Sequence, residues 1–212
     1  MNEKKIQDAK LVAITFDDGP NLSTTPLVLE KLKKHDVLAS FFLIGELINE
    51  KTFPVVEQEI ELGYEICNHS WTHSYMDRME PELIKKEIED TDQIIHKITG
   101  AAPAFFRPPY IAVKDEMYDA IDLPFINGIN CLDWDENITA AERVEGILGK
   151  VKDGDIILLH DFADNPNTVE ALDDIILGLK EQGFTMVTIS RLFELKGVNP
   201  RVNKKLWSNV FE

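Results

Sequence analysis

Hydrophobic residues along the chain fall into short continuous runs, which are separated by longer segments of mixed polarity. The runs are rich in Val, Ile and Phe, and apolar residues do not alternate with polar ones within them. Such runs are typical of strands buried on both faces of a parallel sheet. We therefore expect strands at Leu11–Phe16, Val37–Ile44, Tyr64–Cys67, Ala104–Phe106, Pro124–Ile129, Asp155–Leu159 and Phe184–Val187.

The segments between these runs carry hydrophobic residues at helical spacing. Ser23-Thr24-Thr25 is a candidate cap for the first helix, Pro81 and Gly100 flank another, and Gly63 and Gly183 follow two more. The expected helices contain Leu27, Leu29 and Leu32; Val55, Val56 and Ile60; Leu83, Ile84, Ile88, Ile94, Ile95 and Ile98; Ala140–Lys150; and Thr168–Lys180. Seven strands interleaved with helices predict a parallel α/β protein.

The length of 212 residues fits one domain, and 44 % hydrophobic residues are enough for its core. We expect a single domain over residues 1–212, with its core at about 11–195. No apolar run approaches the 18 residues of a membrane span. The first ten residues lack the apolar stretch of a secretory signal. The chain is therefore expected to be cytoplasmic, or part of a secreted protein whose leader has been removed.

The charge balance restricts the partners of this protein. Its 22 basic and 38 acidic residues give a net charge of -16, which disfavours nucleic acid and anionic membrane surfaces. A metal cation or a neutral polymer meets no such barrier. Cys67 and Cys131 are the two cysteines, and two buried free thiols are favoured over a single bridge between them.

Polar residues that are able to do chemistry gather where the expected strands end. They are Asp17 and Asp18 after the first run, His69 and His73 after the third, Arg107 after the fourth, Asp133 after the fifth, and His160 at the end of the sixth. In a β/α barrel, the loops at the carboxyl ends of the strands build the active site. The placement of these residues predicts a shared site.

The residue types in this set suit metal-assisted hydrolysis. His69 and His73, four residues apart, lie on one side of a helical turn and can chelate one Zn²⁺-type ion. Two histidines and one carboxylate leave a coordination position open, as catalytic zinc sites do. Such a metal acidifies water and polarises a carbonyl oxygen. A second carboxylate can act as general base and another histidine as general acid, which suits hydrolysis of an ester or amide.

Each feature also has a purely structural interpretation. These are a turn at Asp17-Asp18-Gly19-Pro20, a rim position for Arg107 with its charge in water, and core positions for His160 and Trp134. The remaining histidines, His35 and His96, fall on expected surface helices, and we expect both to face solvent.

Five sequence blocks, in this order, resemble the motifs of the polysaccharide deacetylases of carbohydrate esterase family 4. The blocks are Thr15-Phe16-Asp17-Asp18-Gly19-Pro20, His69-Ser70-Trp71-Thr72-His73, Arg107-Pro108-Pro109-Tyr110, Asp133-Trp134 and Leu158-Leu159-His160. The resemblance extends from about Leu11 to Leu195. It implies a distorted (β/α)7-type, TIM-like barrel and a metal-dependent deacetylase acting on an acetylated polysaccharide.

The resemblance also implies a role for each matching residue. Asp18, His69 and His73 would hold one divalent metal, usually zinc, with cobalt or nickel as alternatives. Asp17 would be the general base for the attacking water, and Arg107 would orient and charge-stabilise it. His160 would be the general acid, with Asp133 holding its proton.

The same resemblance assigns the groups around the acetyl substituent. The backbone N–H of Tyr110 would help to stabilise the oxyanion, and Trp134 and Leu158 would line the pocket for the acetyl methyl. Asn130-Cys131-Leu132 departs from the acid or small polar residues that many members carry before Asp133.

Substrates within this family include peptidoglycan, chitin and acetylated xylan. The composition, poor in Lys and Arg, tilts the expectation towards xylan or neutral oligosaccharides. We expect a monomer at an extracellular or cell-wall location, with a cytoplasmic location as the alternative. Two other functions remain open, a glycosidase that uses a carboxylate pair and a sugar-binding module without catalysis.

Overall fold

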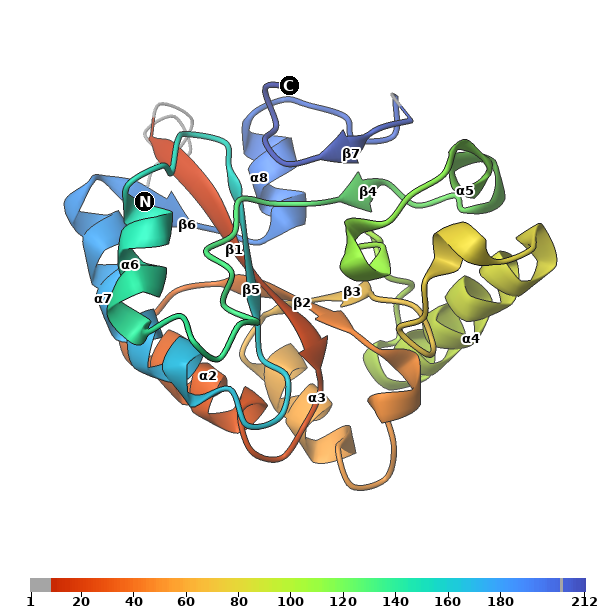
Figure 1. Cartoon of the computed structure of the whole chain (residues 1–212), viewed down its shortest axis with the longest axis horizontal. Coiled ribbons are helices and arrows are strands. Elements are labelled where there is room, and N and C mark those ends of the chain that lie inside the picture. The colour runs from red at the N-terminus through yellow and green to blue at the C-terminus, as the bar shows by residue number, and fades with distance from the viewer. Residues whose placement is uncertain (1–8, 203) are drawn as a thin grey trace.

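A computed structural model describes residues 9–202 and 204–212, which form parallel strands surrounded by helices (Figure 1). The strands are β1 (Lys10–Gly19), β2 (Ala39–Leu43), β3 (Glu65–Asn68), β4 (Phe125–Ile126), β5 (Ile156–His160), β6 (Phe184–Met186) and β7 (Leu206–Trp207). The helices are α2 (Thr25–His35), α3 (Phe53–Glu61), α4 (Pro81–Thr99), α5 (Asp115–Ala120), α6 (Ala140–Leu148), α7 (Pro166–Glu181) and α8 (Ile189–Leu195).

The strands close into a distorted barrel, in whose wall β1 is the longest strand. β1 pairs in parallel with both β2 and β5, and β2 pairs with β3. Single parallel bridges, Asn68–Phe106, Phe106–Phe125 and Ile129–Ile157, continue the ring from β3 through β4 back to β5. Within the described part of the chain, β6 pairs with the first residues of β1 and with no other strand, and β7 pairs with β4 alone. The predicted parallel α/β architecture is confirmed, and the distortion lies where bridges replace full strand pairing.

Helices wrap the outside of this ring. Contacts run in sequence from α6 to α7, α2, α3, α4 and α5, so that successive helices cover neighbouring strands (Figure 1). The largest hydrophobic cluster lies between the strands and helices α2, α3 and α7. A second cluster contains α8 together with Trp207 and Val210. Packing therefore continues beyond Leu195, the expected limit of the core.

The side chains of the strands alternate between two hydrophobic environments. On β1, Leu11 and Ala13 belong to a cluster that also receives a side chain from β2, β3, β4 and β5, and this cluster fills the barrel interior. Val12, Ile14 and Phe16 belong to the outer cluster beneath the helices. Because both faces are apolar, the strands read as continuous hydrophobic runs in the sequence.

Several expected boundaries need correction. β1 continues to Gly19, so that Asp17 and Asp18 lie within the strand instead of after it. The run at 104–106 contributes only bridges through Phe106, because the chain turns away on either side of it. α5, α8 and β7 were not expected, since their segments are short and carry weak periodicity.

Two local expectations about helices have a mixed outcome. The N-cap residue of α2 is Thr24, within the expected segment, but its side chain makes no capping hydrogen bond. Asn21 Oδ1 instead accepts from the backbone N–H groups of Ser23 and Thr24 at 3.1 and 2.7 Å. His35 does not face solvent, because its Nε2 lies 2.6 Å from Asp173 Oδ1 on α7. His96 is exposed, as expected.

Other expectations agree with the fold. Gly100 ends α4 in the left-handed conformation with a φ of 75°, which a Cβ would disfavour. Cys67 and Cys131 are buried free thiols. Among the described residues, no helix combines the length and the apolar character that crossing a bilayer requires.

Candidate functional site

The alternation of the strands carries four polar side chains into the barrel at its carboxyl end. On β1, Asp17 shares the parity of the interior residue Ala13, and His69, directly after β3, shares the parity of Cys67. The same rule applies to Arg107, two residues after the interior Phe105, and to His160, at the end of β5. Residues i and i+2 point to the same face of a strand. The barrel therefore gathers these side chains from four separated segments of the sequence.

Asp18 joins this group through a local irregularity of the backbone. The pairing register between β1 and β2 shifts between Asp17 and Gly19, and Asp18 has a φ of 72°. In a regular strand Asp18 would point towards the helices, opposite to Asp17. The irregularity brings both carboxylates to one opening, where they contact different partners. The interpretation of this segment as a plain turn is wrong.

Asp18, His69 and His73 form a cluster of metal-ligand atoms. Asp18 Oδ1 lies 3.2 Å from His69 Nε2 and 3.1 Å from His73 Nε2. This oxygen is buried and has no hydrogen-bond partner among the described residues. His69 Nδ1 donates to the carbonyl oxygen of Arg107 at 2.8 Å, which leaves the Nε2 lone pair facing Asp18.

The two histidines do not lie on a helical turn, contrary to the expectation. Residues 69–75 are irregular, with Ser70 at a φ of 65° and His73 at 56°. Ser70 Oγ accepts from the backbone N–H of His73 at 3.0 Å and closes this tight loop. The loop brings the imidazole of His73 back beside that of His69, with 4.8 Å between the ring centroids.

The cluster fits a divalent transition metal. Ligand atoms about 2.0–2.2 Å from a tetrahedral zinc ion are about 3.3–3.6 Å from one another, slightly more than the observed 3.2 and 3.1 Å. Burial alone raises the pKa of Asp18, but the facing His69 and the charges of His69 and His73 lower it to about 2. Burial and the neighbouring His69 lower the pKa of His73 to about 4. Both groups are thus in the protonation states that bind metal at neutral pH.

Asp17 is buried beside a buried guanidinium. Arg107 Nη1 donates to Asp17 Oδ1 at 2.5 Å and to Thr15 Oγ1 at 2.8 Å. Its Nη2 donates to the carbonyl of Asn127 at 2.7 Å, and the group stacks on Phe42 with 4.0 Å to the ring centroid. Arg107 is fully buried, so the rim interpretation is wrong. These contacts hold one oxygen of Asp17 and leave Oδ2 directed towards His69, 3.9 Å from its Nε2.

His160, at the end of β5 and beside Asp17 of β1, is paired with Asp133. Asp133 is fully buried, and its Oδ1 accepts from His160 Nδ1 at 2.8 Å. Burial lowers the pKa of His160, but the hydrogen bond and the charge of Asp133, with Asp17 and Asp18 nearby, raise it to about 9. His160 is therefore an imidazolium at neutral pH, with Nε2 available to the pocket.

These residues surround a pocket of about 530 Å³, a size typical of small-ligand sites. The lining residues are Asp17, Asp18, His69, His73, Pro108, Tyr110, Ile111, Asn130, Leu132, Trp134, Leu158 and His160. Leu158 is buried in the wall, whereas Tyr110 and Trp134 are 54 % and 58 % exposed. The core interpretation of Trp134 is therefore wrong, and its ring is free to contact a ligand.

Tyr110 occupies a left-handed conformation, with a φ of 58°. In this turn the N–H groups of Ile111 and Ala112 donate to the carbonyls of Pro108 and Pro109. Among the described residues, no backbone or side-chain acceptor takes the N–H of Tyr110. The turn thus presents a free N–H at the pocket wall.

The structure brings the residues singled out from the sequence to one pocket, but sequence reasoning missed the residues that contact them from behind. Thr15 and Asn127 bind Arg107, and Thr168, Asn165 and Arg143 lie behind Asp133. Of these residues, Thr15 alone could have been found from the sequence, because it lies two residues before Asp17 and therefore on the same face of β1. Asn130 and Leu132, noted as a departure from the family pattern, line the pocket.

Comparison with known proteins gives consistent matches. The family model for polysaccharide deacetylase matches residues 4–124. The chain is 51 % identical over 204 residues to a bifunctional xylanase/deacetylase of Pseudobutyrivibrio xylanivorans, covering 96 % of the chain and 34 % of the relative. It is 35 % identical over 190 residues to a peptidoglycan-N-acetylglucosamine deacetylase of Listeria monocytogenes, covering 89 % of the chain and 40 % of the relative.

Among solved structures, a family 4 acetyl xylan esterase from Clostridium thermocellum in complex with a cobalt ion superposes with a TM-score of 0.91. It is 43 % identical, and the match covers 95 % of this chain and 99 % of that one. The chain spans about a third to two fifths of the length of the two curated relatives. It therefore corresponds to one part of those larger proteins.

Proposed function

The chain belongs to the polysaccharide deacetylase family, and on that premise we propose that it hydrolyses N- or O-linked acetyl groups on a sugar polymer. One observation carries the proposal. A His-His-carboxylate donor set, a second carboxylate and a paired histidine converge on one pocket from separate segments. We further propose that residues 1–212 form one catalytic domain. We also propose that this domain is a monomer, and light scattering would test its mass in solution.

Asp18, His69 and His73 are proposed to hold the metal, with zinc as the first choice and cobalt or nickel as alternatives. The cobalt-bound relative supports a divalent transition metal at a site of this kind. When bound, the ion supplies Lewis acidity, which makes a water molecule more acidic and polarises the acetyl carbonyl. The chain's own residues then move the protons.

Asp17 is the proposed general base. Its Oδ2 faces the donor set, while Arg107 holds Oδ1 and stabilises the charge. The carboxylate takes a proton from a water molecule as the water oxygen attacks the acetyl carbonyl carbon. We propose that the N–H of Tyr110, which has no acceptor among the described residues, donates to the oxyanion that forms.

His160 is the proposed general acid. Its Nε2 proton passes to the sugar nitrogen or oxygen as the bond to the acetyl carbon breaks, which gives acetate and a free amine or hydroxyl. Asp133 keeps the proton on Nδ1 and stabilises the imidazolium. Trp134 and Leu158 are proposed to enclose the acetyl methyl.

Acetylated xylan is the proposed substrate class. The relative with 51 % identity is named as a xylanase/deacetylase and the cobalt-bound structure as an acetyl xylan esterase, whereas the peptidoglycan enzyme is 35 % identical. The net charge of -16 also favours a neutral polymer. Xylan and peptidoglycan are extracellular polymers, so we propose an extracellular or cell-wall location.

An acetate-release panel tests the activity and the substrate together. The zinc- or cobalt-loaded protein is expected to release acetate from acetylxylan faster than from chitooligosaccharides or peptidoglycan, and chelation is expected to stop the release. Faster release from peptidoglycan would reverse the substrate proposal. Binding to these polymers without any acetate release would instead identify a sugar-binding module.

The pH–rate profile tests the pairing of His160 with Asp133. Because Asp133 raises the pKa of His160, the acid form persists to higher pH than that of a free histidine. The alkaline limb of kcat/KM is therefore expected to move to lower pH in Asp133→Asn. Asp174→Asn, at an exposed position on α7, is the matched control and should leave the limb in place. An unmoved limb in Asp133→Asn would remove Asp133 from this role.

A further inference from the structure

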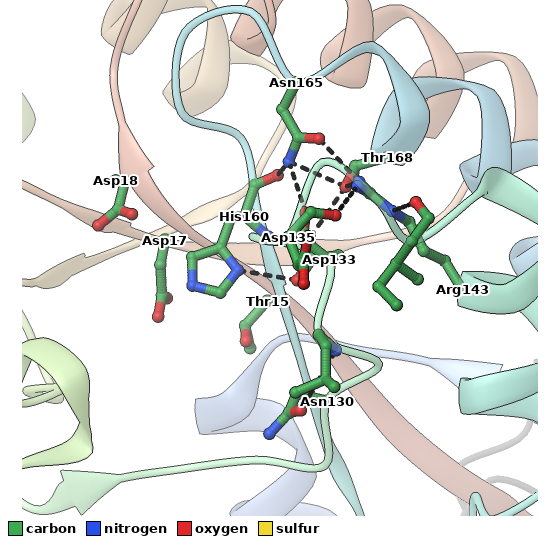
Figure 2. Close-up of polar contacts among 12 residues, drawn as sticks. Thr15, Asp17, Asp18, Asn130, Asp133, Asp135, Arg143, His160, Asn165 and Thr168 are labelled. Atoms are coloured by element: carbon green, nitrogen blue, oxygen red, sulfur yellow. Dashed lines mark hydrogen bonds and ion pairs between the residues drawn. The ribbon is translucent and has the colours of Figure 1, made fainter.

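A buried cluster of polar side chains lies behind Asp133, on the side away from Asp17 and Asp18 (Figure 2). It consists of Arg143 on α6, with Asn165 and Thr168 at the start of α7. All three side chains are almost completely buried, and Arg143 is 1 % exposed. The general acid of the proposed reaction thus has an ordered support that none of the sequence blocks includes.

Arg143 reaches several uncharged acceptors with its guanidinium. Its Nη1 donates to Asn165 Oδ1 and to Thr168 Oγ1, both at 2.7 Å. Its Nη2 and Nε donate at 3.0 Å to the carbonyls of Asp135 and Ile138, in the loop that follows Asp133. A buried guanidinium is costly unless its donors are satisfied, and these contacts give each of its three nitrogens at least one acceptor.

The contacts of Thr168 fix the direction of its hydroxyl proton. Thr168 Oγ1 accepts from Arg143 Nη1 at 2.7 Å and from Asn165 Nδ2 at 3.0 Å. A hydroxyl has two lone pairs and one proton. With both lone pairs occupied by N–H donors, the proton is directed to Asp133 Oδ2, 2.9 Å away.

This hydroxyl and the backbone N–H of His160 together hold Oδ2 of Asp133 and so limit how the carboxylate is turned. The terminal torsion of an aspartate is broad, so the carboxylate needs contacts that fix it. Oδ2 accepts from Thr168 and from the backbone N–H of His160 at 2.7 Å, which leaves Oδ1 on His160 Nδ1. Asn165 Nδ2 also donates to the carbonyl of His160 at 3.0 Å.

We propose that Arg143 and Thr168 are positioning residues for the general acid, because they order a hydrogen-bond chain that holds Asp133 on Nδ1 of His160. Arg143 sets the direction of the Thr168 hydroxyl, and the hydroxyl sets the orientation of the carboxylate. The carboxylate then keeps the His160 proton on Nδ1, so that Nε2 faces the pocket. This inference rests on the proposed function for the role of His160, while the hydrogen-bond chain itself is independent of the substrate.

The test compares Thr168→Val, which removes the hydroxyl at similar shape, with Thr168→Ser, which keeps it. In Thr168→Val, kcat is expected to fall about 10- to 100-fold with little change in KM, the range seen when a residue that orients a catalytic ligand is lost. Thr168→Ser is expected to recover most of this loss. Thr99→Val, which removes a hydroxyl at the far end of α4, is the control.

A second measurement does not depend on activity. The ¹⁵N chemical shifts of the His160 ring in the zinc-loaded protein report which nitrogen carries the proton when the ring is neutral, with His160→Gln assigning the signals. At alkaline pH, where the ring has lost its second proton, the unchanged protein is expected to hold the Nδ1–H form, and Thr168→Val a mixture of the two tautomers. Arg143→Lys, which keeps the charge but not the forked donors, is expected to lie between them.

Three results would overturn the proposal. The first is a Thr168→Val variant with unchanged kcat. The second is a Thr168→Val variant that has only a lower melting temperature, with kcat and the His160 tautomer unchanged. The third is a Thr168→Ser variant whose kcat is as low as that of Thr168→Val. If Arg143→Lys does not fold, the comparison of Thr168→Val with Thr168→Ser still tests the proposal. If the unchanged protein releases no acetate from any polymer, the proposed function fails, and the ring nitrogen shifts still test the positioning of His160.

Discussion

Asp18→Asn is expected to lower the zinc affinity of the protein more than about 100-fold, and to abolish acetate release at limiting metal. Removing a residue that only orients a ligand typically costs 10- to 100-fold in affinity, and Asp18 is proposed as a ligand itself. Its Oδ1 is a buried oxygen without a hydrogen-bond partner among the described residues, beside two imidazole nitrogens. The amide that replaces it has no negative charge to offset that of the ion.

Metal content and affinity are measured separately from turnover in this experiment. Elemental analysis gives the zinc content of the purified protein, and competition with a chromogenic chelator gives the affinity. His73→Gln is expected to behave as Asp18→Asn does, whereas His96→Gln, at an exposed position on α4, should keep full metal content and activity. Full zinc occupancy in both Asp18→Asn and His73→Gln would mean that the ligand set is wrong.

Asp17→Asn is expected to reduce kcat about 10²- to 10⁴-fold, the usual effect of losing a general base, with the metal content preserved. The amide keeps the size of the side chain and an acceptor for Arg107, but it does not take a proton from water. The contacts of the two carboxylates support this separation of roles. Asp17 contacts the guanidinium of Arg107, while Asp18 contacts the two imidazoles.

This substitution also affects stability, which must be measured alongside kcat. Leaving a buried charge without its partner costs about 3–5 kcal/mol, and the amide introduced by Asp17→Asn would reduce this loss by keeping one hydrogen bond to Arg107. The melting temperature is therefore expected to fall, and kcat should be compared well below it. Loss of the metal in Asp17→Asn together with full occupancy in Asp18→Asn would exchange the two roles.

The strand positions were predictable because both faces of the barrel wall are apolar. A strand packed on the interior and on the helices leaves an uninterrupted hydrophobic run, as in β2 and β5. β7 and α8 were missed since they are short and gain stability from contacts with distant segments. Trp207, for example, packs against Phe193, which belongs to another element.

The local geometry around His69 and His73 was predicted incorrectly, although the sequence analysis had singled out both residues as candidate metal ligands. A spacing of four residues between His69 and His73 indicates a helical turn, but the structure has a loop with two positive φ values. Many backbone paths bring residues i and i+4 together, and the spacing does not select among them. Likewise, the register shift beside Asp18 leaves no trace in the sequence, because Asp and Gly are common in ordinary turns.

The architecture and the polar residues at the ends of the strands could be predicted from the amino-acid sequence, since hydrophobic periodicity and residue chemistry are local properties. The partner that each polar group meets depends on how the chain folds. Arg107 meets Asp17 across 90 positions of the chain, and Thr168 meets Asp133 across 35. Such pairings depend on barrel closure and on the alternation of side chains along each strand. These long-range constraints are absent from any single segment of the sequence.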